Sequence, residues 1–132
     1  MSRSGYTEDS DDNWATICWR GAVASAIRGK RGQALLREAL AALDALPEPK
    51  LIANELEKDG NVCLLGAVGK ARKLDMSGID PEDRGTVAAK FGIAEALAAE
   101  IVYLNDEWIG RRESPEARFA RMRKWLVGNI KQ

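Results

Sequence analysis

The sequence predicts a mostly α fold: a single small helical domain with a helix-turn-helix-like corner and one short β-hairpin, for which a helical alternative stays open. Three observations predict this class. Apolar residues recur at helical spacing in most segments, prolines and glycines mark the segment ends, and 132 residues have room for one hydrophobic core. Residues 1–12 are predicted to form a flexible acidic arm, and residues 13–132 to form the domain.

The densest pattern lies over residues 75–107. Asp80 and Pro81 are the residue types of a helix cap and a first helical position, which predicts a helix that begins there. A second helical pattern starts at Thr86, breaks at Gly92 and resumes at Ala94. After the break, the apolar face comprises Leu97, Ile101 and Leu104.

This outline is similar to a helix-turn-helix motif, but its second helix is unsuited to reading DNA. A recognition helix offers basic or amide side chains to base edges and phosphates. Residues 94–104 instead contain Glu95 and Glu100 and no basic residue. The pattern therefore favours a structural helical corner over DNA recognition.

The first half of the chain predicts two further helices. A helix capped by Asn13 is expected to bury the face formed by Trp14, Ile17, Cys18, Gly21 and Ser25. The loop 28–32 ends this helix, and a second helix runs to Pro47. Its core-facing residues are predicted to be Leu36, Leu40, Leu43 and Leu46.

Shorter signals define the remaining elements. Asp59 and Gly60 are a two-residue hairpin turn signal within residues 51–65, and a helix is predicted from Cys63 to Leu74. Ser114 followed by Pro115 predicts the start of the last helix. Its apolar face comprises Phe119, Met122, Leu126 and Ile130.

The sequence lacks the residues that most reactions need. It contains no histidine, the commonest general base and a principal zinc ligand. Cys18 and Cys63 have apolar neighbours and no metal-ligand spacing, which predicts two buried free thiols in a reducing cytoplasm. The acidic run at 9–13 begins like a calcium loop, but Trp14 and Arg20 replace its glycine and closing acid. No metal and no cofactor is predicted.

Candidate partner-binding residues are basic and fall in two groups. Arg28, Lys30 and Arg31 lie in the predicted loop. The C-terminal helix carries a denser group, which comprises Arg118, Arg121, Arg123 and Lys124 beside Trp125. Because positions 118, 121 and 124 are three residues apart, they are predicted to form one exposed stripe that docks on an acidic protein or a nucleic acid.

A candidate acidic site follows the helix predicted over residues 94–104, at Asn105, Asp106 and Glu107. Acids at the negative end of a helix dipole are unfavourable unless they pair with a cation. Pairing with Arg111 or Arg112 is favoured here over a ligand site.

Three stretches carry a resemblance to a known family. They are GNVCLLGAVGKARKLDMSGIDPED, VAAKFGIAEALAAEIVYLNDE and ESPEARFARMRKWL, within about residues 12–130. In these stretches the chain resembles a family of short uncharacterised proteins of tailed phages and prophages. The resemblance implies a phage-related role inside the bacterial host, and it supplies no activity, substrate or catalytic residue.

The favoured interpretation is a small phage-type binding or modulator protein without catalysis, located in the cytoplasm of the bacterial host. A host or phage protein is favoured as partner over nucleic acid, no membrane partner is expected because no apolar segment is long enough, and a homo-oligomer stays open. The alternatives are a nucleic-acid-binding regulator, an inhibitor of a host defence system and, less favoured, an enzyme that uses Asp106 and Glu107.

Overall fold

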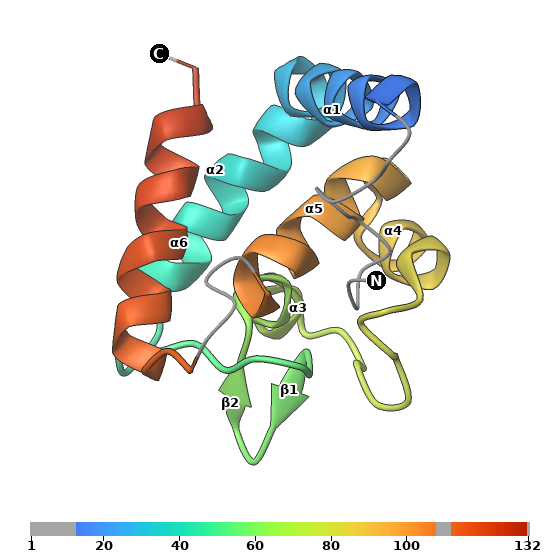
Figure 1. Ribbon diagram of the computed structural model, residues 1–132. Helices are drawn as coiled ribbons and strands as arrows, with labels where there is room; N and C mark the ends of the chain where they lie inside the picture. The colour runs from blue at the N-terminus through green and yellow to red at the C-terminus, as the bar shows by residue number, and fades with distance from the viewer. Residues whose placement is uncertain (1–12, 108–111, 132) are drawn as a thin grey trace.

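The computed structural model describes residues 13–107 and 112–131, with residues 13–16 described by their backbone alone, and it confirms the mostly α class (Figure 1). The described residues form six helices and one two-stranded antiparallel hairpin. The elements are α1 (Asn13–Arg28), α2 (Lys30–Asp44), β1 (Glu57–Lys58), β2 (Asn61–Val62), α3 (Leu64–Arg72), α4 (Arg84–Phe91), α5 (Glu95–Asp106) and α6 (Pro115–Asn129). The predicted acidic arm lies outside the described residues.

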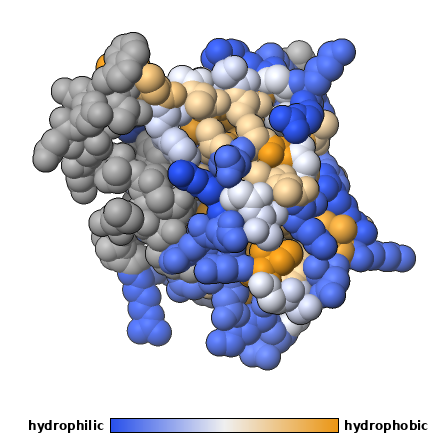
Figure 2. All heavy atoms as spheres, turned by 90° about the vertical axis from the view of Figure 1, so that its right-hand side faces the viewer, coloured by the Kyte–Doolittle hydropathy of each residue, from blue (hydrophilic) through white to orange (hydrophobic). Residues whose placement is uncertain are grey.

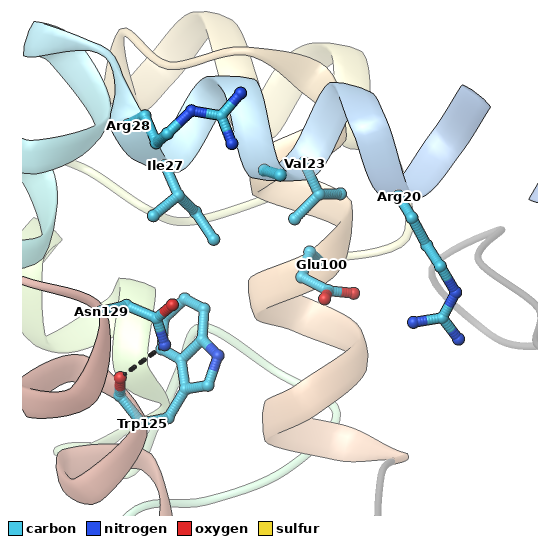
Figure 3. A pocket seen from close by; sticks show the side chains of 8 residues that line it. Arg20, Val23, Ile27, Arg28, Glu100, Trp125 and Asn129 are labelled. Atoms are coloured by element: carbon cyan, nitrogen blue, oxygen red, sulfur yellow. Dashed lines mark hydrogen bonds between the residues drawn. The ribbon is translucent and has the colours of Figure 1, made fainter. Parts of the chain in front are cut away.

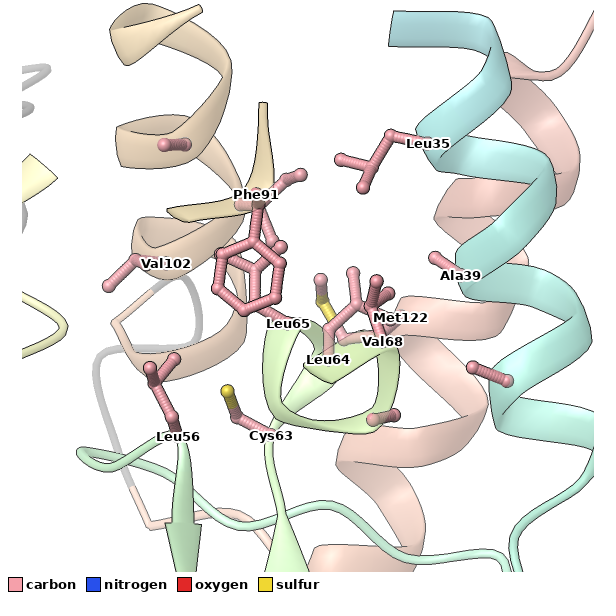
Figure 4. Packing of buried hydrophobic residues seen from close by; sticks show 14 of the residues in the cluster. Leu35, Ala39, Leu56, Cys63, Leu64, Leu65, Val68, Phe91, Val102 and Met122 are labelled. Carbon is pink, nitrogen blue, oxygen red and sulfur yellow. The ribbon is translucent and has the colours of Figure 1, made fainter. Parts of the chain in front are cut away.

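Helix α3 lies at the centre of the hydrophobic core. Its first six residues, Leu64 to Gly69, are all buried, whereas an amphipathic helix buries only one face. Helix α2 packs against α3 and α6, and α5 packs against α1, α3 and α4. Side chains from these helices converge on α3, among them Leu35, Phe91 and Met122 (Figure 4). The described helices therefore share one hydrophobic cluster.

Three predicted turns and caps are confirmed. Asp59 and Gly60 have φ angles of 53° and 82°, the left-handed values that a tight hairpin turn requires. Gly92, with φ of 71°, ends α4 and lets the chain turn into α5. Ser114 caps α6, because its hydroxyl oxygen accepts a hydrogen bond from the Ala117 N–H at 3.1 Å.

The predicted helix start at Asp80 is wrong. Its carboxylate accepts a hydrogen bond from the Glu82 N–H at 2.9 Å, but the residues that follow form turns. Asp83 caps α4 instead, accepting hydrogen bonds from the N–H and the hydroxyl of Thr86 at 3.2 and 2.9 Å. An aspartate that accepts from the second residue after it closes an isolated turn as readily as it starts a helix, so its type alone does not select the cap.

The predicted buried face of α1 is also wrong at the four residues that the burial description covers; the Trp14 side chain lies outside it. Ile17 is 60% exposed, and Cys18, Gly21 and Ser25 are exposed as well. Helix α1 packs against α5 and α2, and among its residues 17–28 the buried one is Val23, at 6% exposure. In a helix rich in alanine, periodicity is compatible with more than one apolar face, and packing selects between them.

The junction between α1 and α2 is shorter than predicted, because Gly29 alone separates the two helices. The core-facing side of α2 is shifted around its axis. Leu36 and Leu43 are buried as predicted, whereas Leu40 and Leu46 are only partly buried. The other buried apolar positions of α2 belong to Leu35, Ala39 and Ala42.

Candidate functional site

The C-terminal basic stripe that the sequence predicts is not an exposed surface. Arg118 is only 8% exposed. Its Nε donates to the Asn105 carbonyl at 2.9 Å, and its Nη1 donates to the Leu51 carbonyl at 3.1 Å. The prediction is therefore wrong for Arg118, which connects α5, α6 and the segment before the hairpin.

Two further arginines of this group also bind within the chain. Arg121 donates from Nε and Nη2 to the Glu113 carboxylate, both at 2.9 Å, and from Nη1 to the Leu104 carbonyl at 2.6 Å. Arg123 binds Asp44 with both Nε and Nη2, at 2.9 and 3.2 Å, and these hydrogen bonds lower the pKa of the Asp44 carboxyl. Lys124 is exposed.

The candidate acidic site begins with a buried structural residue. Asn105 is 2% exposed, and its Oδ1 accepts a hydrogen bond from the Leu64 N–H, the first residue of α3, at 3.2 Å. Its Nδ2 donates to the Ile52 carbonyl at 2.9 Å and to the Asp106 carboxylate at 2.7 Å. The Asn105 side chain therefore stabilises the fold through hydrogen bonds, and one of these bonds is to the Asp106 carboxylate.

The two candidate groups of the C-terminal half thus meet at one place. The free carbonyls at the C-terminal end of α5 carry partial negative charge, which the guanidinium groups of Arg118 and Arg121 neutralise. The pairing expected for Asp106 and Glu107 involved Arg111, which lies outside the described residues, or Arg112, which is exposed. Arg118 and Arg121 therefore stabilise the C-terminal end of α5 through its carbonyl groups.

The described part of the chain shows a buried, inert thiol at Cys63 and no metal centre. Burial raises the pKa of the Cys63 thiol to about 12, and its Sγ accepts a hydrogen bond from the Gly66 N–H at 3.3 Å. The thiol stays protonated at neutral pH and is a poor nucleophile. Cys18 is exposed, contrary to prediction. Across residues 13–107 and 112–131, no three Cys, Asp or Glu side chains cluster as a metal ion requires.

The remaining candidates, Arg28, Lys30 and Arg31, are all exposed and lie where α1 passes into α2. Residues 13–37 contain no acid, so no carboxylate of this segment neutralises them. Lys131, after α6, approaches the same place, since its Nζ donates to the Arg28 carbonyl at 2.8 Å and its carbonyl accepts from Arg37 Nη2 at 2.8 Å. We call this surface the basic corner; it comprises Arg28, Lys30, Arg31, Arg37 and Lys131.

A groove of about 310 Å³ borders the basic corner, between α1, α5 and α6 (Figure 3). We call it the Trp125 groove. Helix α1 supplies its apolar wall and its cations, α5 supplies an acid, and α6 supplies an aromatic ring. The residues concerned are Arg20, Val23, Ile27, Arg28, Glu100 and Trp125.

Apolar surface alone does not distinguish this groove. Apolar atoms also gather between charged side chains on the face shown in Figure 2. A hollow of about 490 Å³ on the other side of α1 is lined mainly by small residues, with Lys30 and Arg31 among its lining. The Trp125 groove differs because it combines aliphatic residues and an indole ring with two arginines and one carboxylate.

Sequence reasoning missed most of this groove. It selected Trp125 only for its basic neighbours, and it considered Glu100 only as an argument against DNA binding. The available signal was the spacing of Arg20, Val23, Ile27 and Arg28, which places them on one side of a helix. This spacing indicates one wall of a groove only once the fold places α5 and α6 opposite α1.

Comparison with known proteins gave no match to a family model, to a curated protein or to a solved structure. The resemblance to tailed-phage and prophage proteins therefore stays a prediction. No helix in the described ranges has the length and apolar character needed to cross a membrane.

Proposed function

We propose that this chain is a binding protein without catalysis, which docks on an acidic protein surface through the basic corner. The observation that carries the proposal is the gathering of five exposed cations at the α1–α2 junction and the end of α6, namely Arg28, Lys30, Arg31, Arg37 and Lys131. A surface of one charge sign attracts partners of the opposite sign and orients their approach.

A protein partner is favoured over nucleic acid. Nucleic-acid surfaces need many cations that are available to phosphates. In the C-terminal helix Arg118 is buried, and Arg121 and Arg123 are neutralised by the carboxylates of Glu113 and Asp44.

The resemblance to phage proteins indicates the kind of partner and its location in the cell. The partner is then a host or phage protein in the bacterial cytoplasm, and the binding modulates what that protein does. Inhibition of a host defence system is one outcome that such binding would have. The enzyme alternative based on Asp106 and Glu107 receives no support from the surroundings of Asn105, because that side chain is committed to hydrogen bonds within the fold.

The test is capture of the partner from host cells with the tagged protein after nuclease treatment. Lys30→Glu combined with Arg31→Glu should abolish capture of the protein that the wild-type chain retains. The matched control is Lys70→Glu with Lys90→Glu, which reverses two exposed lysines on α3 and α4 and should leave capture unchanged.

Three results would contradict the proposal. They are capture that survives reversal at the corner, capture that the control pair abolishes equally, and retained material that consists of nucleic acid before nuclease treatment and disappears after it. Circular dichroism of each variant shows that the fold persists.

A further inference from the structure

A second charged surface lies between the hairpin and the loop that joins α3 to α4. The segment that leads into β1 and this loop border a hollow of about 370 Å³, whose lining includes Glu55, Glu57 and Asp80. We call it the acidic hollow. All three acids are exposed, and Lys58, which follows Glu57 in β1, points to the opposite side of the strand. The hollow therefore presents carboxylates to solvent.

The carboxylates of the acidic hollow lie apart from the basic side chains of the same molecule. In the described part of the chain, no basic side chain is within ion-pair distance of Glu55 or Glu57. Asp80 accepts its hydrogen bond from the Glu82 N–H, which carries no charge. The surrounding loop adds to the negative charge, because residues 74–83 contain four acids and no base. This surface is therefore suited to a basic partner.

The acidic hollow and the basic corner lie at opposite ends of the molecule. Figure 1 shows the hairpin and the loop before α4 at one end, and the junction of α1 with α2 at the other. A domain of this length has a radius of gyration of about 14 Å, whereas physiological salt screens exposed charges beyond about 8 Å. The two surfaces therefore do not neutralise each other within one molecule. The chain has a net charge of zero, so its copies are not kept apart by overall repulsion.

We propose that the chain associates with itself head to tail, with the basic corner of one copy docked at the acidic hollow of the next. Lys30 and Arg31 of one copy bind the carboxylates of Glu55 and Glu57 of the next copy. A contact between two different surfaces is heterologous, so each added copy brings a further corner and a further hollow. Ion pairs between exposed side chains are weak and are screened by salt, so this association is reversible.

The inference goes beyond the proposed function, although it uses the same basic corner. Self-association needs no host or phage protein, and it gives the acidic hollow a role that the proposed function does not. Only self-association requires Glu55 and Glu57. These two residues therefore separate the two contacts in an experiment.

Sedimentation velocity of the full chain over a concentration series, at low and at high salt, tests the association. The weight-average mass should rise with concentration at low salt and return to that of the monomer at high salt. Lys30→Glu with Arg31→Glu, and separately Glu55→Lys with Glu57→Lys, should each weaken association at least about tenfold. The control pair of exposed lysines, Lys70→Glu with Lys90→Glu, changes the net charge as much as the corner pair does and should still associate.

A mixture of the two reversed variants tests whether the two surfaces bind each other. The variant reversed at the corner keeps its acidic hollow, and the variant reversed at the hollow keeps its basic corner. Their equimolar mixture should therefore form a one-to-one dimer that grows no further. A chain with all four substitutions has exchanged charges between the surfaces and has the net charge of the wild type, so it should recover association.

Three results would overturn the inference. They are a wild-type chain that stays monomeric at every concentration in low salt, association that either reversed pair leaves unchanged, and reversed variants that are folded by circular dichroism but do not bind each other.

The two proposals fail separately. If the chain stays monomeric while capture of the partner depends on Lys30 and Arg31, self-association alone falls. If Glu55→Lys with Glu57→Lys abolishes self-association while capture is indifferent to Lys30 and Arg31, the proposed docking of the partner at the basic corner falls instead.

Discussion

Asn105→Ala tests whether the candidate acidic site is in fact a structural junction. In the native chain the Asn105 side chain satisfies a buried backbone group, the Leu64 N–H at 3.2 Å, and a partly buried one, the Ile52 carbonyl at 2.9 Å. Alanine leaves both without their partner. An unpaired buried group costs about 1–3 kcal/mol, so the free energy of unfolding should fall by at least about 1–3 kcal/mol through the Leu64 N–H alone. Since small domains are stable by about 5–15 kcal/mol, the loss is large.

The assay is urea denaturation followed by tryptophan fluorescence and circular dichroism, with the unfolding free energy extrapolated to water. Asn61→Ala is the matched control, because Asn61 lies in the hairpin, is partly exposed and pairs with Lys58 in the strand ladder. Its effect should stay within about 0.5 kcal/mol. A loss below about 0.5 kcal/mol for Asn105→Ala would refute the structural role and reopen the site for a ligand.

Three further predictions follow from single side chains. Leu36 is 0% exposed, so Leu36→Ala should cost about 2–5 kcal/mol in the same denaturation assay, and a loss below about 0.5 kcal/mol would place it outside the core. Cys18 is exposed, and Cys63 is buried with a raised pKa. A thiol reagent at neutral pH should therefore modify Cys18 quickly and Cys63 only on unfolding, and equal rates of modification of the two thiols would contradict this. The hydrogen bond from Arg72 lowers the pKa of Glu38 below its usual 4.5, so this pair should stabilise the fold above that pH and lose its effect as the pH falls further. Glu38→Gln should flatten the acid side of the melting-temperature profile, and an unchanged profile would refute the assignment.

Short-range chemistry made part of the fold predictable. Asp59 with Gly60 predicted the hairpin because few residue pairs accept left-handed φ at a tight turn. Gly92 and Ser114 marked helix boundaries through their own backbone and side-chain hydrogen bonds. The apolar spacing of Leu97, Ile101 and Leu104 was strong enough to identify the buried face of α5.

The candidate site was less predictable, because the sequence shows which residues are charged but not which of them bind groups within the fold. Arg118 and Arg121 looked like a docking stripe, yet the carbonyls at the end of α5 bind both. The three-residue spacing that predicted an exposed stripe is equally compatible with arginines of α6 that bind the C-terminal end of α5. Only a contact between segments distant in the sequence distinguishes the two.

By itself, the sequence determined the helical class, the main turns, the absence of histidine chemistry and the acid-free stretch that carries Arg28, Lys30 and Arg31. The tertiary structure decided which face of α1 is buried, which arginines stay available and where a groove forms beside Trp125. The physical reason is that turns and helix caps depend on neighbours within a few residues, whereas burial, charge pairing and grooves depend on surfaces that only folding brings together.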